Sequence, residues 1–281
     1  MYYVQEADKP NYMLKLFNII KLKDDKIILP VQSEEISLKK AEKLAKKTKK
    51  ILDKTNCNKI ILSKEIKKQE NFKNYLYSDQ VNIVDGKWLF EILSYQAVEY
   101  IIKKQNMKKE EITVSVLVND ITNNLLENIK KIIREYKRVN IITNHINKFK
   151  NVETKILEQE GIMITVTNNK KKSLSKSKII LNVDFPTELI NKYSIYEKAI
   201  IINIKGKVEI NSKRFNGINI NDYEISFKDL EDFDYDKKIL YEKKHIYEAQ
   251  ILKNQPFKYI EERIRNDRVE IIRMKGNRTI I

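Results

Sequence analysis

The chain of 281 residues carries 55 Lys and Arg against 39 Asp and Glu, a formal net charge of +16, and 42% of its residues are hydrophobic. That length suffices for two domains with separate apolar cores. No apolar run approaches the roughly 18 residues of a membrane span, and no secretory signal pattern opens the chain. A single cysteine, Cys57, excludes an internal disulfide and a cysteine-rich zinc site. We expect a cytoplasmic protein with no membrane partner and no metal.

The positive charge is spread along the chain. It amounts to +8 over residues 1–110, +5 over 111–200 and +3 over 201–281. Nucleic-acid binding normally needs a focused basic surface, so the charge alone does not establish it. The abundance of Lys, Asn, Ile and Tyr is also what an AT-rich coding sequence would produce. Nucleic-acid binding therefore remains one alternative. The other is that the positive charge reflects the coding sequence and binds no partner.

The first 110 residues combine a hairpin pattern with alternating helix and strand patterns. Apolar stretches on both sides of a Lys-Asp-Asp-Lys turn predict a β-hairpin over residues 13–31. An amphipathic helix over 37–54 has one apolar side and one lysine-rich side. The lysine-rich side is either solvated or a surface for phosphate or an acidic partner. Strands are then expected at 59–62 and 81–84, and helices at 63–77 and 88–101.

The alternation is clearer after residue 111. Thr122 is a plausible N-cap for a helix to residue 136, and Gly161 should end a second helix that covers 149–157. Regular alternation of this kind predicts a mostly parallel sheet covered by helices, which here amounts to a degenerate Rossmann-like unit. Strands are expected at 113–118, 139–142, 162–166, 179–183 and 199–204.

Polar stretches suggest where the domains begin and end. We place one boundary in the stretch 103–111 and another at an acidic segment, 229–236. The acidic segment lacks the glycine and the spacing of a calcium loop and is expected to be a hydrated linker. Helices at 238–253 and 257–266 should pack back on the preceding units. The expected organisation is an α/β protein with segments 1–110, 111–235 and 236–281.

Polar side chains collect directly after four of the expected strands. Ligands of open α/β sheets bind at the carboxyl ends of parallel strands, so these side chains should converge on one edge. A lysine-rich loop nearby offers a local cluster for an anion. The alternative is that Asn, Asp and Thr only cap helices and turns here. The candidate ligand-binding residues are Asn119, Asp120, Thr122, Asn144, His145, Asn168, Lys170, Lys171, Lys172, Asn182 and Asp184.

Four stretches, IITNHINKFKNVETKILEQEG, MITVTNN, SLSKSKIILNVDFP and KAIIINI, carry a resemblance to a known family. Together they resemble the NADP-binding domain of shikimate dehydrogenases and glutamyl-tRNA reductases. In those families the second strand ends in Asn-Arg-Thr, and the arginine meets the 2′-phosphate of NADP. Asn144 matches the asparagine, whereas His145 stands in place of the arginine. Asn182 and Asp184 take places similar to residues before a ligand-facing loop. The resemblance implies a Rossmann fold and an NADP-linked oxidoreductase.

Glycine is missing where such a domain holds its dinucleotide. A Cβ at the first strand-to-helix turn obstructs close approach of the backbone to a pyrophosphate. Val118-Asn119-Asp120-Ile121-Thr122-Asn123 forms that turn here; Asn and Asp allow the turn, but their side chains occupy space. We therefore expect no cofactor, with a smaller anion at the helix that starts after Thr122 left open. The chain has five glycines, at 86, 161, 206, 217 and 276.

The leading hypothesis is a non-catalytic binding or regulatory protein on a scaffold without its cofactor loop. Its partner would be a small anionic ligand or another protein. The first alternative is a divergent NADP-dependent oxidoreductase, in which Asn144, His145 and the lysines at 170–172 receive the cofactor's phosphate. Nucleic-acid binding is the second alternative. His245 lies in a charged helix and is expected to be solvated.

Overall fold

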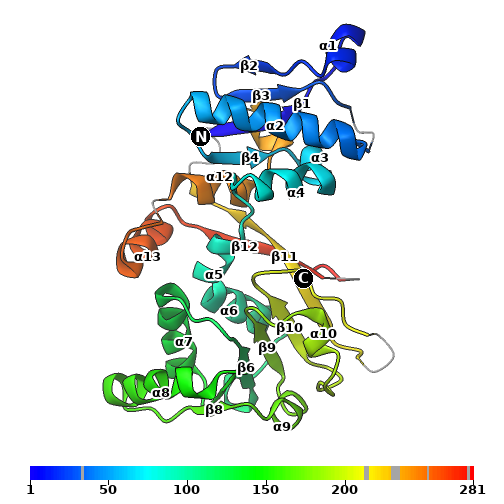
Figure 1. The fold of residues 1–281 in the computed structure, drawn as a ribbon. Coiled ribbons are helices and arrows are strands. Elements are labelled where there is room, and N and C mark those ends of the chain that lie inside the picture. The colour runs from blue at the N-terminus through cyan, green and yellow to red at the C-terminus, as the bar shows by residue number, and fades with distance from the viewer. Residues whose placement is uncertain (33–34, 212–214, 229–234, 252, 277–278) are drawn as a thin grey trace. The chain divides into compact units, whose positions relative to one another are not determined.

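The computed structural model describes residues 1–32, 35–211, 215–228, 235–251, 253–276 and 279–281, which form two compact units (Figure 1). Unit 1 comprises Met1–Gly86 and Lys228–Leu252, and unit 2 comprises Lys87–Phe227 and Lys253–Ile281. This division differs from the expected boundaries. The polar stretch 103–111 lies inside unit 2, and the last segment is shared between the units. Polarity marks solvent exposure of a connection, and it does not reveal on which core the flanking helices pack.

Unit 1 contains a five-stranded sheet in the order β2-β3-β1-β4-β5. Its strand pairs are parallel except for the antiparallel hairpin of β2 and β3. Helices α2 and α4 bury one face of the sheet. Tyr241, directly after α11, and Ile246, on α12, form a cluster with Tyr3 on β1 and Ile61 on β4. The elements are β1 (Tyr2–Glu6), α1 (Tyr12–Phe17), β2 (Lys21–Lys23), β3 (Lys26–Leu29), α2 (Leu38–Lys54), β4 (Lys59–Leu62), α3 (Lys64–Lys67), α4 (Glu70–Ser78), β5 (Asn82–Ile83), α11 (Tyr235–Leu240) and α12 (Lys243–Gln250).

The beginning of unit 1 differs from the predicted hairpin. Only residues 21–29 form it, and the preceding apolar run is the helix α1. Asn11 accepts a hydrogen bond from the amide of Met13, and Asn18, at a φ of 50°, ends α1 in the left-handed conformation. A short apolar run fits a helix or a strand equally well, so these two asparagines decide the outcome. The strand β1, between β3 and β4 in the sheet, was not predicted.

His245, on α12, is buried, contrary to its expected solvation. It is 2% exposed, and neither ring nitrogen has a hydrogen-bond partner in the described part of the chain. Burial lowers the pKa of His245 to about 4, although a carboxylate oxygen of Glu242 lies 3.6 Å from Nε2. The prediction was wrong because the charges along the helix gave no sign of its packing against β4.

Unit 2 contains a seven-stranded sheet in the order β12-β11-β10-β9-β6-β7-β8. From β8 to β11 all neighbours are parallel, and β12 is antiparallel to β11. The elements are α5 (Lys87–Ile92), α6 (Ser94–Lys104), a 3-10 turn (Lys109–Glu111), β6 (Thr113–Leu117), α7 (Asn123–Glu135), β7 (Arg138–Ile142), α8 (Ile146–Glu160), β8 (Thr165–Thr167), α9 (Lys170–Leu174), β9 (Ile179–Asn182), α10 (Thr187–Ile190), β10 (Ile200–Asn203), β11 (Ile218–Ser226), α13 (Phe257–Asn266) and β12 (Glu270–Gly276).

The strand order of unit 2 confirms the predicted fold class. Its six parallel strands, numbered along the chain, lie in the order 3-2-1-4-5-6, which is the order of a Rossmann fold. β9 and β10 are buried at every residue, as expected for strands covered on both faces. Gly161, at a φ of 67°, ends α8 where the sequence predicted a cap. The last helices do pack back: α11 and α12 on unit 1, and α13 on α7.

Two further expectations concern single segments. The third expected strand of unit 2, at 162–166, is displaced toward the C-terminus and consists of Thr165–Thr167. The acidic linker expected at 229–236 falls mostly on 229–234, which lie outside the described residues. Within the part of the chain that the structure describes, no helix combines the length and apolarity needed to cross a bilayer.

Candidate ligand site at the carboxyl edge of unit 2

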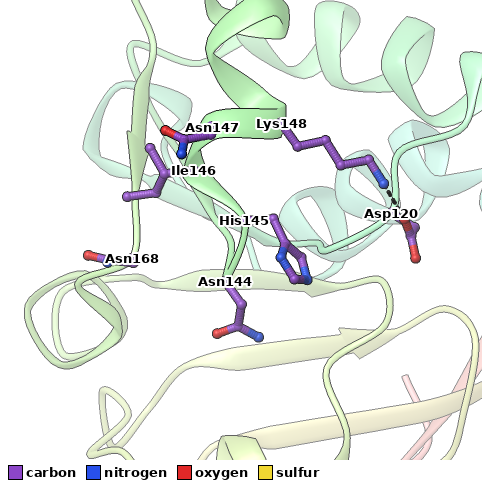
Figure 2. Close-up of a pocket in the computed structure, with 7 residues that line it drawn as sticks. All are labelled: Asp120, Asn144, His145, Ile146, Asn147, Lys148 and Asn168. Carbon is purple, nitrogen blue, oxygen red and sulfur yellow. Dashed lines mark hydrogen bonds and ion pairs between the residues drawn. The ribbon is translucent and has the colours of Figure 1, made fainter.

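Three neighbouring parallel strands, β6, β7 and β8, end at one edge of the sheet beside a pocket of about 540 Å³ (Figure 2). Four of the candidate residues predicted from the sequence line this pocket. Asp120 follows β6, Asn144 and His145 follow β7, and Asn168 follows β8. Parallel register brings these ends together because each strand pairs directly with the next. The remaining lining residues are Ile146, Asn147 and Lys148.

Hydrogen bonds fix the strand ends around the pocket. The side-chain oxygen of Asn119 accepts a hydrogen bond from the amide of Asn144 at 3.0 Å, which joins the ends of β6 and β7. Lys148 reaches across to the carboxylate of Asp120 and forms an ion pair with it (Figure 2). That ion pair lowers the pKa of Asp120 below its usual value. His145 and Asn144 are exposed at the pocket. The pocket therefore presents amides, one imidazole and an ion pair of one ammonium and one carboxylate to solvent.

The β6–α7 turn is filled by a carboxylate of the protein itself. Asp184, which follows β9, accepts hydrogen bonds from the amide of Asn119 at 2.8 and 3.1 Å and from the amide of Asp120 at 2.8 Å. In a Rossmann fold the amides of this turn and of the next helix face the pyrophosphate of a dinucleotide. Asp184 was predicted as a ligand-binding residue. Here it occupies the donors that such a ligand would use.

A second carboxylate closes the start of α7. The Thr122 hydroxyl caps the helix by accepting a hydrogen bond from the amide of Leu125 at 3.1 Å. The same hydroxyl donates to Glu91, which is 4% exposed and lies 3.3 Å from the ammonium of Lys205. Thr122 thus acts as the predicted cap. The side chains of Asp184 and Glu91 therefore place two carboxylates beside the N-terminus of α7, with the ammonium of Lys205 next to Glu91.

The start of α8 is open by comparison. The amides of Asn144 and His145 donate to the side chains of Asn119 and Thr143, but His145, the N-cap residue of α8, makes no capping hydrogen bond with its own side chain. Uncapped first-turn amides carry partial positive charge and favour negatively charged or carbonyl groups. Lys148 stands in the first turn of the same helix and lines the pocket. The donors of this edge are therefore concentrated at the start of α8, one strand away from the Rossmann phosphate position.

Several predicted site residues do not reach the pocket. Asn182 is buried and serves a network of amides, donating to Asn203 at 2.9 Å and to the carbonyl of Phe185 at 3.0 Å. Lys170 is 7% exposed, and its ammonium lies over the rings of Phe185 and Tyr193 at 5.9 and 5.8 Å from the ring centres. Burial lowers the pKa of Lys170. The predicted lysine loop is instead the short helix α9, whose other two lysines, Lys171 and Lys172, are exposed and absent from the pocket lining.

Sequence reasoning missed residues of two kinds. Ile146, Asn147 and Lys148 directly follow the predicted rim residues, so the first turn of the expected helix could have been included with them. Glu91 carries no such signal, since it lies 31 residues before the hydroxyl that it contacts. Over the described residues, no three His, Cys, Asp or Glu side chains gather in a way that could hold a metal ion.

Comparison with known proteins adds remote likenesses only. No family model and no curated protein matches the chain. It is similar to L-tryptophan dehydrogenase from Nostoc punctiforme at 10% identity and a TM-score of 0.31, over 77% of this chain and 65% of that one. Ornithine transcarbamoylase from Giardia lamblia matches at 8% identity and 0.31, over 75% of each chain. Shikimate 5-dehydrogenase from Listeria monocytogenes matches at 8% and 0.31, over 78% of this chain and 85% of that one. The strand order of unit 2, not these likenesses, defines its fold.

Proposed function

We propose that this protein is a non-catalytic binding protein that uses a Rossmann-like unit without a dinucleotide. Its ligand is a small anion held at the β7–α8 turn. The observation that carries the proposal is the contact of Asp184 with the amides of Asn119 and Asp120. These amides are the donors that a pyrophosphate needs, and a carboxylate of the protein already satisfies them.

Electrostatics supports the exclusion of a dinucleotide. A phosphate placed at the start of α7 would lie beside the carboxylates of Asp184 and Glu91, and Glu91 already pairs with Lys205. Like charges that approach in a partly buried place repel strongly because little water screens them. The phosphate clamp of an oxidoreductase is also not assembled from the expected side chains, since Lys170 lies over aromatic rings and does not line the pocket.

The open turn supports binding of a smaller anion. The start of α8 has no side-chain cap, Lys148 stands in its first turn, and His145 lies beside it. Together these groups supply backbone donors, an ammonium group and an imidazole ring at one pocket. The Asp120 carboxylate shares Lys148, which limits the affinity for an anion and favours one that can also accept hydrogen bonds from amides.

The test uses NADPH, NADH and inorganic phosphate as probes of the intact chain. We expect neither dinucleotide to give saturable thermal stabilisation. Phosphate should shift the amide NMR resonances of Ile146, Asn147 and Lys148 and leave those of Asn119 and Asp120 in place. Saturable stabilisation by NADPH or NADH, with shifts at Asn119 and Asp120, would overturn the proposal. An absence of phosphate-induced shifts at the start of α8 would refute the choice of ligand.

A pair of lysine variants on α8 provides the control. Lys148→Gln should weaken the phosphate response, because it removes the charge that lines the pocket. Lys150→Gln removes an exposed lysine from the same helix outside the pocket lining and should leave the response unchanged. Equal responses of the two variants would show that general surface charge, and not the pocket, attracts the anion.

A further inference from the structure

The start of unit 1 exposes an unusual concentration of large apolar side chains. Six of them lie within eleven consecutive residues, on α1, on β2 and between the two, and none of the α1 residues is buried. Soluble proteins rarely expose large apolar side chains so close together unless another surface covers them. We call this cluster the apolar tip. It consists of Tyr12 (74% exposed), Met13 (54%), Leu16 (56%), Phe17 (56%), Ile19 (44%) and Leu22 (48%).

The fold holds the apolar tip outward. Asn11 caps the start of α1, and Asn18 ends it in the left-handed conformation. The ammonium of Lys47, on α2, donates hydrogen bonds to the carbonyls of Phe17 and Asn18 at 2.9 and 2.7 Å. Figure 1 shows α1 at one end of the five-stranded sheet of unit 1. The exposure is therefore a property of a helix that is fixed at both ends.

Lysines border the apolar tip. Lys9 precedes α1, and Lys21 and Lys23 flank Leu22 on the edge strand β2; all three are exposed. Lys43 and Lys50 are exposed about one turn on either side of Lys47 on α2. Nearby carboxylates are fewer, and some have partners within unit 1: Asp25 pairs with Lys237, and Glu42 pairs with Lys46. Asp8 and Asp24 remain exposed. The surroundings of the tip are thus basic.

An apolar protrusion with a basic border fits one class of partner best. A second copy of the chain that paired with β2 in an antiparallel manner, centred on Leu22, would set Lys21 against Lys23, and opposed like charges destabilise strand pairs. A nucleic acid would satisfy the lysines and leave the aliphatic side chains uncovered. An anionic lipid surface accepts both, because apolar side chains enter the headgroup boundary while lysines meet the phosphates.

We propose that the apolar tip lies against an anionic membrane surface, with Lys9, Lys21 and Lys23 at the headgroups. The expectation of no membrane partner came from the lack of a long apolar run, and a tip that rests in the headgroup layer needs no such run. This proposal does not depend on the ligand of unit 2.

Vesicle co-sedimentation of the full chain tests the proposal. The protein should bind vesicles of phosphatidylcholine with phosphatidylglycerol and bind vesicles of phosphatidylcholine alone much less, and high salt should weaken binding. Leu16→Asp should lower partitioning at least about tenfold, because a buried leucine contributes enough transfer free energy for that factor. Lys21→Glu with Lys23→Glu should weaken binding only to the anionic vesicles.

Leu157→Asp is the matched control, since Leu157 is a similarly exposed leucine, at 47%, on α8 of unit 2. It should bind vesicles as the unchanged chain does, and thermal melts should show both leucine variants folded. Three results would overturn the proposal. The first is no binding to anionic vesicles at low salt, and the second is equal effects of Leu16→Asp and Leu157→Asp. The third is that the protein forms a dimer, does not bind vesicles, and becomes monomeric with Leu16→Asp. The last result would identify a second copy as the occupant.

Discussion

The β6–α7 and β7–α8 turns of unit 2 lie side by side at one edge of the sheet and differ at the start of the helix that follows each. In the first, Asp184 occupies the turn amides, and Thr122 with Glu91 closes the helix start. In the second, the side chains of Asn119 and Thr143 occupy the turn amides, but the helix start has no side-chain cap and faces a pocket. The start of α7 is thus closed by side chains of the protein, whereas the start of α8 is left open beside the pocket. A Rossmann-like strand order alone does not reveal which helix start is closed by side chains and which faces a pocket.

The largest effect on stability is expected when the Asp184 carboxylate is removed from the β6–α7 turn. Asp184→Ala should lower the free energy of unfolding by about 1.5–3 kcal/mol, because hydrogen bonds to a charged acceptor are lost and the partly buried amide of Asn119 is left unpaired. Hydrogen exchange at Asn119 and Asp120 should also accelerate. Glu188→Ala, an exposed carboxylate on the nearby α10, is the control and should have little effect. A loss no larger than that of the control would mean that the contact does not hold the turn.

Loss of the α7 cap should have a smaller effect. Thr122→Ala removes the acceptor for the amide of Leu125 and the donor to Glu91, and we expect a cost of about 1 kcal/mol, typical of a lost N-cap. Urea unfolding measures it. Thr122→Ser keeps the hydroxyl and should recover most of the stability. If the serine variant is as unstable as the alanine variant, packing of the threonine methyl group, and not the cap, is responsible.

Substitution of Lys170 tests whether this residue, which the sequence placed at the ligand-binding edge of the sheet, has a buried side chain. Burial lowers its pKa in the folded protein below the unfolded value, so the folded state releases the proton first as pH rises. At neutral pH the protein bears the cost of a buried ammonium, partly offset by the rings of Phe185 and Tyr193 and by a hydrogen bond of 3.5 Å to the carbonyl of Asn168. Lys170→Met should therefore alter stability by less than about 1 kcal/mol at pH 7.

The pH dependence of stability, compared between Lys170→Met and the unchanged protein, tests whether the pKa of Lys170 is lowered in the fold. As pH rises from the lowered folded pKa toward the unfolded pKa, the unchanged protein should gain stability relative to Lys170→Met. Melting temperatures of both proteins, measured in parallel between pH 7 and pH 10, check this because the other lysines titrate equally in the two. An opposite trend would mean that the fold stabilises the ammonium more than water does.

The smallest effect on stability is expected at the open turn. Lys148→Gln breaks the ion pair with Asp120, which is exposed to solvent, so the melting temperature should stay that of the unchanged protein. The phosphate response should fall at the same time. A clear drop in melting temperature would show that the β7–α8 turn, like its neighbour, depends on its polar contacts for stability, and the contrast between the turns would disappear.

Much of this edge was accessible from sequence because it depends on local patterns. Strand and helix periodicity placed β6, β7, α7 and α8, and parallel strands must end at a common edge, which brought Asp120, Asn144 and Asn168 together. The roles of Asp184 and Glu91 were not accessible in this way. Each contacts the β6–α7 turn from a segment distant along the chain, and the sequence carries no mark of that pairing.

The sequence by itself determined the alternation of strands and helices, the parallel character of the second sheet and the absence of glycine from its first turn. Those features follow from hydrophobic periodicity and local backbone preference, which act over a few residues. Tertiary structure decided how the chain divides into units, the burial of His245 and Lys170, and the outward position of the apolar tip. It also decided that Asp184 fills the turn, because a hydrogen bond between segments 64 or 65 residues apart forms only after the sheet has brought them together.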